Sequence, residues 1–342
     1  MVEMKLNSID LFSGIGGLSL GLKEAGFKVL ASVEIDEPAV NAYKLNHPET
    51  VVFKEDIRKL DTNNIKILLN NEPLHLLAGC PPCQGFSSIR RLNKKRSVRD
   101  DRNQLVLEFL RFVKELKPLT VMMENVPGLK DYYLFKHLYR ELKRLGYNPK
   151  YNIINVKEYG VPQNRKRLVL VGSVLGNLNI AEGQDIKVTV REIIGNLPKP
   201  EESDDPAHKI IPKHKPKIME MIKKIPKNGG GRKDVPEYTL ECHKKPNVGF
   251  NDVYGRLRWD DYSTTITGGC LNPSKGRFLH PEQNRCISAR EAALLQSFPI
   301  DYKLPVDIPK TKLALLIGNA LPPKFSYIQS NNIKNHILEN LG

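Results

Sequence analysis

The sequence has 342 residues, and its 53 Lys and Arg outnumber its 38 Asp and Glu, which gives a formal net charge of +15. A chain of this length predicts one large domain and a smaller one, and the positive charge favours a nucleic acid over a membrane as partner. Five scattered cysteines disfavour a disulfide framework, and the N-terminus shows no charged leader or long apolar stretch, so we expect a cytoplasmic protein with no membrane contact.

The first half of the chain alternates short apolar runs with helical patterns. We expect strands at 8–12, 29–35, 51–57, 74–80, 120–126 and 167–173, and helices at 17–26, 38–46, 105–116 and 135–146. This alternation is typical of βαβ units, so the sequence predicts an α/β fold with a doubly wound, mostly parallel, Rossmann-like sheet. Gly26 and Gly146 stand where helix ends favour a left-handed residue.

The second half differs in composition. From about residue 176 the sequence is rich in Pro, Lys and Gly, and its strand candidates are shorter, which predicts a second, smaller domain. Helical patterns return at 288–296 and 324–341, and we expect the last of them to pack back on the first domain. The predicted parts are a catalytic domain at 1–184, a target-recognition domain at 185–290 and a C-terminal segment at 291–342.

The segment DLFSGIGGLSLGL, residues 10–22, joins the first strand to the first helix. Its glycines at 14, 16 and 17 allow a tight turn and let a ligand approach the helix N-terminus. Glu34 follows the next strand, where it can accept hydrogen bonds from ribose hydroxyls, and Asp56 follows a third apolar run, where it can bind an adenine amino group. Ser19 occupies the third glycine position of the dinucleotide fingerprint, which disfavours a nicotinamide cofactor. A structural turn with solvated acids is the alternative to an adenosine-bearing cofactor.

The segment Cys80-Pro81-Pro82-Cys83 admits a metal knuckle, a redox pair or a nucleophile. A zinc knuckle needs a second pair, and the other three cysteines are far apart in the sequence, so we expect no metal. A redox pair normally opens a helix in a smaller domain, whereas two prolines keep this chain extended. Cys83 is then presented on a turn at the carboxyl edge of the predicted sheet, where parallel sheets bind ligands.

Ordered motifs over nearly the whole chain resemble those of the DNA cytosine C5 methyltransferases. They are DLFSGIGG from 10, PPCQGFS from 81, ENV from 124, QNRKR from 163, REAALLQSFP from 290 and GNALPP from 318. The resemblance implies a sequence-specific DNA cytosine C5 methyltransferase with S-adenosylmethionine as methyl donor, Cys83 as nucleophile and Cys80 as a buried neighbour. It implies a cofactor site made of Phe12, Ser13, Gly14, Gly16, Gly17, Glu34, Ile35, Asp56, Ile57, Pro82, Leu105 and Asn319.

The chemistry needs further groups beside Cys83. Addition of a thiolate to C6 of cytosine makes C5 nucleophilic, and a cysteine thiol must lose its proton for that attack. Arg165 and Arg167 supply positive charge, and the resemblance implies that one of them holds O2 of the base. A protonated Glu124, favoured by burial, can neutralise N3. The alternative is that Glu124 only forms a structural ion pair with Arg165 or Arg167. We expect Asn125 to orient the surrounding backbone.

A cytosine in a duplex must leave the helix to reach Cys83. We expect the basic run at 87–105 to be a loop that closes on phosphates, and the second domain to read the sequence. Thr265-Ile266 resembles a Thr-apolar pair that the family keeps near the flipped base. The expected DNA contacts are Gln84, Ser87, Arg90, Arg91, Gln163, Arg256, Arg258, Thr265, Lys275 and Arg277.

We expect a monomer that acts on double-stranded DNA, as the protective half of a restriction-modification pair whose endonuclease acts separately. A transfer-RNA cytosine methyltransferase on the same scaffold is the nearest alternative, because it shares the nucleophile and cofactor motifs. A DNA-binding homologue without activity and a dinucleotide-dependent redox enzyme are the others.

Overall fold

The computed structural model describes residues 5–82, 104–184, 186–238 and 252–341. The chain divides into two units. Unit 1 comprises Met1–Tyr159, Lys166–Gln184 and Leu321–Gly342, and unit 2 comprises Gly160–Arg165 and Asp185–Ala320.

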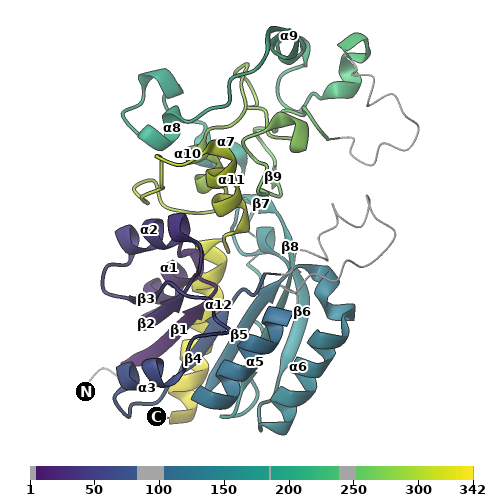
Figure 1. Ribbon diagram of the computed structural model, residues 1–342. Coiled ribbons are helices and arrows are strands. Elements are labelled where there is room, and N and C mark those ends of the chain that lie inside the picture. The colour runs from purple at the N-terminus through teal and green to yellow at the C-terminus, as the bar shows by residue number, and fades with distance from the viewer. Residues whose placement is uncertain (1–4, 83–103, 185, 239–251, 342) are drawn as a thin grey trace. The chain divides into compact units, whose positions relative to one another are not determined.

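A seven-stranded sheet forms the centre of unit 1 (Figure 1). Its strands lie in the order β3-β2-β1-β4-β5-β8-β6; β8 is antiparallel to its neighbours β5 and β6, and the other adjacent pairs are parallel. The predicted α/β fold with a mostly parallel sheet is therefore confirmed. The strands are β1 (Leu6–Leu11), β2 (Phe27–Val33), β3 (Val51–Phe53), β4 (Leu76–Gly79), β5 (Thr120–Asn125), β6 (Lys150–Asn155) and β8 (Lys166–Ser173).

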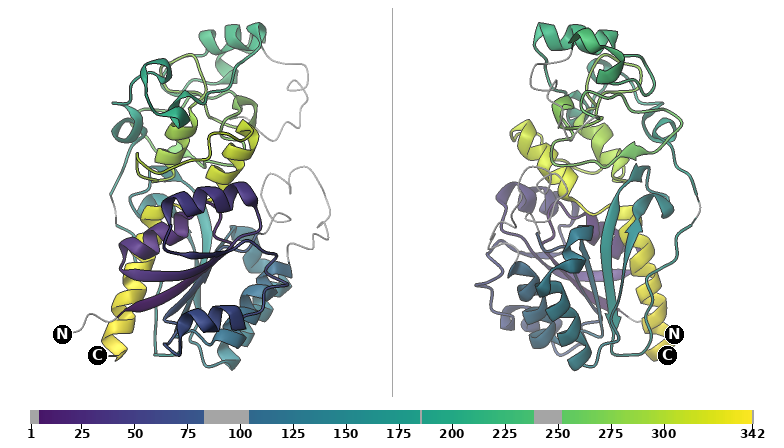
Figure 2. Two further views of the ribbon diagram at one scale, coloured as in Figure 1. Left: turned by 60° about the vertical axis from the view of Figure 1, so that its left-hand side comes forward. Right: turned by 90° about the vertical axis from the view of Figure 1, so that its right-hand side faces the viewer.

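Helices cover both faces of this sheet (Figures 1 and 2). Helices α3, α5 and α6 pack on one face, whereas α1 and α12 lie together on the other. The unit 1 helices are α1 (Gly17–Glu24), α2 (Glu37–Asn46), α3 (Asn63–Leu69), α5 (Leu105–Leu116), α6 (Tyr133–Arg144) and α12 (Pro323–Leu341), with 3-10 helices η3 (Pro127–Asp131) and η4 (Val156–Glu158).

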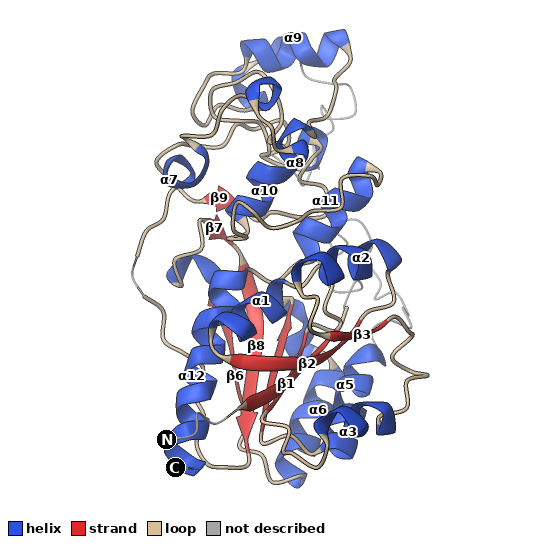
Figure 3. Cartoon of the chain, turned by 90° about the vertical axis from the view of Figure 1, so that its left-hand side faces the viewer, coloured by secondary structure: helices blue, strands red, loops and turns tan. Residues whose placement is uncertain are grey.

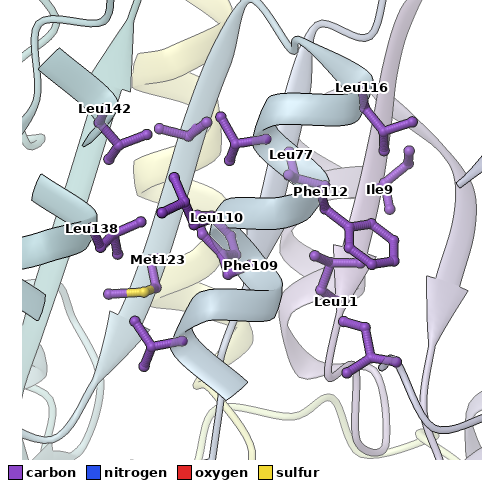
Figure 4. Close-up of a cluster of buried hydrophobic side chains, with 14 of the residues drawn as sticks. Ile9, Leu11, Leu77, Phe109, Leu110, Phe112, Leu116, Met123, Leu138 and Leu142 are labelled. Carbon is purple, nitrogen blue, oxygen red and sulfur yellow. The ribbon is translucent and has the colours of Figure 1, made fainter. Parts of the chain in front are cut away.

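The main hydrophobic core lies between the sheet and α5 (Figure 4). Ile9 and Leu11 of β1 point toward Phe109 and Phe112 of α5, and all four side chains are fully buried. Successive side chains of a strand point to opposite faces, so Asp10 between them faces the side of α1. The alternation in β1 thus places the Asp10 carboxyl group on the side of α1, the helix that follows the glycine turn.

Several local predictions can be compared with this fold. Gly26 and Gly146 have φ angles of +95° and +88°, as expected after α1 and α6. The expected strand at 51–57 ends at Phe53, because polar residues follow it. Helix α3 and strand β6 were not predicted; β6 lies at the sheet edge, and its first three residues are exposed, so it lacks an apolar run.

Unit 2 consists mainly of short helices and loops (Figure 3). Strands β7 (Gln163–Asn164) and β9 (Ser263–Thr264) form a parallel pair. Helix α10 packs against α7, α8 and α11, so residues 291–320, expected in the C-terminal segment, lie in unit 2. The helices are α7 (Val190–Ile194), α8 (Pro206–Lys209), α9 (Pro216–Lys224), α10 (Ala289–Leu295) and α11 (Lys310–Asn319), with 3-10 helices η5 (Pro200–Glu202), η6 (Arg232–Asp234), η7 (Pro236–Tyr238) and η9 (Pro273–Lys275).

None of the helices in the described ranges is long and apolar enough to cross a lipid bilayer.

Helix α12 packs back on unit 1, as the sequence predicted, and meets α1 at Gly21. A Cβ atom at Gly21 would lie 2.4 Å from the Tyr327 nitrogen and 2.5 Å from the Ser326 Cβ. The Ser326 hydroxyl also donates a hydrogen bond of 2.8 Å to the Leu18 carbonyl. Only glycine permits this approach of the two helices.

We predict that Gly21→Ala lowers the free energy of unfolding by about 1–3 kcal/mol, because the new methyl group overpacks the contact. Urea denaturation measures the change. Glu24→Ala, at an exposed position of the same helix, is the control and should change stability by less than about 0.5 kcal/mol. Alanine favours a helix over glycine by about 1 kcal/mol, so equal or greater stability of Gly21→Ala would show that the contact tolerates a methyl group.

Candidate active site

The expected site residues of unit 1 gather at one edge of the sheet. Parallel strands β1 to β5 all end at this edge, and β8, which runs the other way, begins there. Open sheets bind ligands at this edge, outside the carboxyl ends of parallel strands. The segments that reach it are Phe12–Gly17, Glu34–Ile35, Asp56, Cys80–Pro82, Glu124–Asn125 and Lys166–Arg167.

The glycine turn, residues Phe12–Gly17, is tightly fixed against β2. The amides of Phe12 and Ser13 both donate to the Val33 carbonyl, at 2.9 and 3.2 Å. Phe12, Gly14 and Gly16 have positive φ angles of 62°, 55° and 91°. Positive φ is costly for phenylalanine, so the surrounding contacts must hold this turn in place.

Glu34 connects the end of β2 to the glycine turn. Its Oε2 accepts a hydrogen bond of 2.9 Å from the Gly14 amide, and its Oε1 accepts one of 2.8 Å from the Asp36 amide. Burial raises the pKa of Glu34, and these two amides oppose that effect. The adjacent Ile35 side chain is 63% exposed, an unusual position for isoleucine. A carboxylate beside a bare apolar side chain fits a ribose and its adenine ring.

Asp56 lies after β3, on a turn that Arg58 stabilises. The Arg58 guanidinium donates to both carboxylate oxygens of Asp56, and this pairing lowers the pKa of Asp56. The neighbouring Ile57 has a buried side chain, so its expected contact with a cofactor would be made by its backbone. That side chain is buried in the main core, and its carbonyl accepts a hydrogen bond of 2.6 Å from Arg111.

Three other expected cofactor residues lie at element ends. Pro82 and Leu105 are half-buried, and Leu105 opens α5. Asn319 is exposed and is the last residue of α11 in unit 2.

The approach to Cys83 is described as far as Pro82. Asn125 donates a hydrogen bond of 2.8 Å from Nδ2 to the Pro81 carbonyl and accepts one of 2.8 Å at Oδ1 from the Val126 amide. Asn125 therefore orients the backbone two residues before Cys83, as expected. Cys80 is half-buried rather than buried, and its amide donates to the Leu11 carbonyl at 3.2 Å. Cys83, Gln84, Ser87, Arg90 and Arg91 lie outside the described residues.

An ion pair joins Glu124 and Arg167 across strands β5 and β8. Arg167 Nε lies 2.7 Å from Glu124 Oε1, and the two side chains are only 14% and 10% exposed. Burial lowers the pKa of the Arg167 guanidinium, while Glu124 and the thiol of Cys80 raise it. The pair is the one that a purely structural Glu124 would form. It also places a guanidinium and a carboxylate next to the segment that carries Cys83.

Gln163 and Arg165 perform another task in unit 2. The Arg165 guanidinium donates to the carbonyls of Ile266, Gly318 and Ala320, at 2.9, 3.0 and 3.4 Å. Gln163 is fully buried; its Oε1 accepts from the Ile266 amide and its Nε2 donates to Gln296. The predicted DNA contact of Gln163 is corrected accordingly, because both ends of its amide bond within the protein.

Thr265 stands beside this anchored segment. It is half-buried, and its hydroxyl donates a hydrogen bond of 2.7 Å to the Asn164 carbonyl.

The predicted DNA contact of Arg256 is also corrected, because its guanidinium lies in the interior of unit 2, whereas Arg277 is half-buried and its DNA contact stays a prediction. Arg256 is fully buried, and burial lowers its pKa to about 10. Arg277 donates to the carbonyls of Gly229, Gly230 and Arg256 and pairs with Asp252. The acceptors around the Arg256 guanidinium are the carbonyls of Ile222, Ile225, His280 and Gln283 and the Asn284 side chain.

Arg258 and Lys275, the other basic residues expected to contact DNA, are exposed. The Arg258 side chain is 63% exposed, and its guanidinium lies 3.9 Å from the Asp261 carboxylate.

The sequence did not predict the buried polar residues Asp10, Ser19 and Tyr43 next to the glycine turn. Their signal was weak, since one polar residue in each of three apolar segments is common. Within the described ranges, no three His, Cys, Asp or Glu side chains gather as a metal site would require.

Comparison with known proteins gives a consistent result. The family model for C-5 cytosine-specific DNA methylases matches residues 6–335. The type II methylase M.HgiDII of Herpetosiphon aurantiacus is 36% identical over 340 residues, covering 95% of this chain and 94% of its own. The type II methyltransferase M1.HphI of Haemophilus parahaemolyticus is 36% identical over 329 residues, covering 94% and 84%. A crystal structure titled as a DNA modification methyltransferase encoded within a prophage (E. coli) superposes with a TM-score of 0.74 at 26% identity, covering 98% of this chain and 100% of that one.

We predict that Arg256→Lys lowers the free energy of unfolding by about 2–4 kcal/mol, because one ammonium cannot reach five acceptors spread around a guanidinium. Thermal and urea denaturation measure the loss. Arg258→Lys is the matched control at an exposed position and should change stability by less than about 0.5 kcal/mol. Unchanged stability of Arg256→Lys together with weaker binding of duplex DNA would restore the original prediction.

Proposed function

The chain belongs to the family of C-5 cytosine-specific DNA methylases, and we propose that its reaction runs through a covalent bond between Cys83 and the cytosine that it methylates. The activity itself, sequence-specific methylation of cytosine C5 in DNA, follows from the match of the family model to residues 6–335. That match is the observation that carries the function.

The cofactor site is proposed at the glycine turn. Members of this family use S-adenosylmethionine, which supplies the methyl group when bound. Glu34 would hold the ribose hydroxyls, Ile35 would cover the adenine ring and Asp56 would face its amino group. The exposed isoleucine beside a carboxylate fixed by two amides supports this assignment. The other proposed contacts are Phe12, Ser13, Gly14, Gly16, Gly17, Pro82, Leu105 and Asn319.

Cys83 is proposed as the nucleophile. Its sulfur forms a bond to C6 of the cytosine, which shifts electrons to C5, where the methyl group is accepted; loss of the C5 proton to a base then breaks the bond between sulfur and C6. Arg167 supplies positive charge near Cys80, three residues earlier, and positive charge favours a thiolate. The hydrogen bond from Asn125 to the Pro81 carbonyl would hold the turn while the bond forms.

Glu124 and Arg167 are proposed to bind the base together. Arg167 would hold O2, since the Arg165 guanidinium is already bonded to three carbonyls in unit 2. Glu124 would donate to N3 as negative charge develops in the ring. The carboxyl of Glu124 faces a guanidinium, so a bound cytosine must share it with Arg167.

Unit 2 is proposed to read the DNA sequence. Arg258 and Lys275 are its exposed basic candidates, and Thr265 lies next to the segment that Gln163 and Arg165 anchor. In the basic segment that starts at residue 87, outside the described residues, we propose that Ser87, Arg90 and Arg91 contact phosphates around the flipped cytosine and that Gln84 lies close to it.

The cellular role is proposed by analogy. Two relatives are named as type II methylases, which supports a protective function beside a separate restriction endonuclease. We further propose a cytoplasmic monomer.

We predict that the protein transfers labelled methyl groups from S-adenosylmethionine to duplex DNA and that Cys83→Ser abolishes the transfer. DNA containing 5-fluorocytosine should trap a covalent adduct in the wild type only, because fluorine at C5 blocks the final proton loss. The serine variant should still bind DNA, which shows that it folds. Labelling of tRNA alone would favour the transfer-RNA enzyme, and binding of a mapped target site without methyl transfer or adduct would favour an inactive homologue.

We predict that Glu124→Gln lowers kcat by a factor of about 10² to 10⁴, because glutamine keeps the contact with Arg167 but has no acidic proton to transfer. Single-turnover methylation with bound DNA measures the effect. Glu108→Gln is the matched control, since Glu108 forms a partly buried ion pair with Arg111 on α5. Wild-type activity in Glu124→Gln would assign Glu124 a structural role only.

A further inference from the structure

A buried chain of polar side chains lies next to the glycine turn. The Ser19 hydroxyl donates a hydrogen bond of 2.7 Å to Asp10 Oδ2, and the Tyr43 hydroxyl lies 2.7 Å from the same Ser19 oxygen. Each hydroxyl carries one proton, so Tyr43 donates to Ser19 while Ser19 donates to Asp10. All three side chains are fully buried. The chain thus joins α2 to α1 and α1 to β1.

These hydrogen bonds connect the residues on either side of the glycine turn. Asp10 stands two residues before Phe12, and Ser19 stands two residues after Gly17. Helix α2 supports the turn at a second point, since His47 hydrogen-bonds the Gly16 backbone. His47 Nδ1 lies 2.8 Å from the Lys23 ammonium, which only donates, so the imidazole accepts there and is neutral. Burial accordingly lowers the pKa of His47 to about 4.

The buried carboxyl group of Asp10 is unfavourable for the stability of the fold. Its Oδ1 is buried without a hydrogen-bond partner among the described residues. An apolar side chain would avoid that cost, because burial of an unpaired polar oxygen is unfavourable. Burial, together with the charge of Glu34, raises the pKa of Asp10 to about 7, although hydrogen bonds from the side chain and the backbone of Ser19 oppose this shift. A group this costly beside a ligand-binding turn indicates a purpose other than stability.

We propose that Asp10, Ser19 and Tyr43 are positioning residues that hold the glycine turn in its cofactor-binding conformation. The inference rests on the proposed function in taking S-adenosylmethionine to bind at this turn. The three side chains act through the backbone: β1 and α1 carry the two ends of the turn, and Ser19 fixes their separation. Tyr43 adds α2, whose first turn follows Glu34 and Ile35.

The hydrogen bond between Ser19 and Asp10 depends on the charge of Asp10. An ionised carboxylate accepts a stronger hydrogen bond than a neutral carboxyl group. Asp10 ionises as the pH rises through about 7, so the turn is held more firmly above that pH. The other titratable or charged groups on this side are Glu34 after β2, Lys23 on α1, Tyr43 on α2, His47 directly after α2, and Glu49, which pairs with Lys23. His47 titrates near pH 4.

The test is direct binding of cofactor to the full-length protein without DNA. Calorimetry gives the Kd of S-adenosylmethionine and of S-adenosylhomocysteine between about pH 6 and pH 8.5, across the range where Asp10 changes charge. We expect Ser19→Ala and Tyr43→Phe to raise both Kd values about five- to tenfold at the upper pH, as loss of a buried hydrogen bond predicts. Asp10→Asn should abolish the pH dependence and keep the weaker, low-pH affinity.

Tyr147→Phe is the matched control. Tyr147 is a buried tyrosine whose hydroxyl donates a hydrogen bond of 2.5 Å to the Pro118 carbonyl, away from the glycine turn. It should lose stability like Tyr43→Phe, with no change in either Kd.

The outcomes separate three explanations. Equal pH dependence for both ligands supports positioning of the turn, since they differ by the methyl group and its positive charge. A dependence seen with S-adenosylmethionine alone would overturn the proposal in favour of direct charge attraction. Unchanged Kd values in Ser19→Ala and Tyr43→Phe would also overturn it. A wild-type protein that binds neither ligand would instead refute the proposed cofactor, and this inference with it.

Discussion

The reversed direction of β8 is the constraint on which the candidate active site depends. Parallel strands bring their carboxyl ends to one edge of the sheet. That arrangement gathers the glycine turn and the acidic residues there, but it places no cation beside Glu124. Because β8 runs against β5, its first residues lie at that edge, and Arg167 meets Glu124 across the pair. The same edge carries the segment leading to Cys83, whose backbone Asn125 holds. One strand reversal thus places the Glu124–Arg167 pair, proposed to bind the base, beside the segment that precedes the proposed nucleophile Cys83.

The arginines of this chain have different structural roles, although they are the same residue type. Arg165 and Arg167 are two positions apart, yet one guanidinium binds three carbonyls in unit 2 and the other pairs with a carboxylate in unit 1. Arg256 likewise holds unit 2 together from its interior. A guanidinium has five donors in a fixed plane, so it joins irregular segments whose carbonyls lack a strand partner. Unit 2, with little regular structure, uses arginine in this way.

The sequence predicted those features that depend on local pattern. Apolar periodicity gave α5 its correct bounds, and glycines marked the ends of α1 and α6. Strand β6 was not predicted, because an edge strand with exposed polar residues has no apolar run. The roles of Arg256 and Gln163 could not be read, since charge and polarity do not reveal burial, and their carbonyl partners lie up to 132 residues away. Asp10, Ser19 and Tyr43 were missed because their relation exists only after three elements pack.

The packing of α12 on α1 makes an early part of unit 1 depend on a late part of the sequence. The Ser326 hydroxyl of α12 donates a hydrogen bond to the Leu18 carbonyl of α1, 308 positions earlier in the sequence. The lack of a side chain at Gly21 allows the two helices to approach this closely. During translation, α1 therefore emerges from the ribosome long before α12. The side of α1 that packs on α12 is exposed to solvent in the meantime. Contacts of such separation form slowly. Stable packing of α1, the helix that follows the glycine turn, therefore requires a segment that is synthesised about 300 residues later.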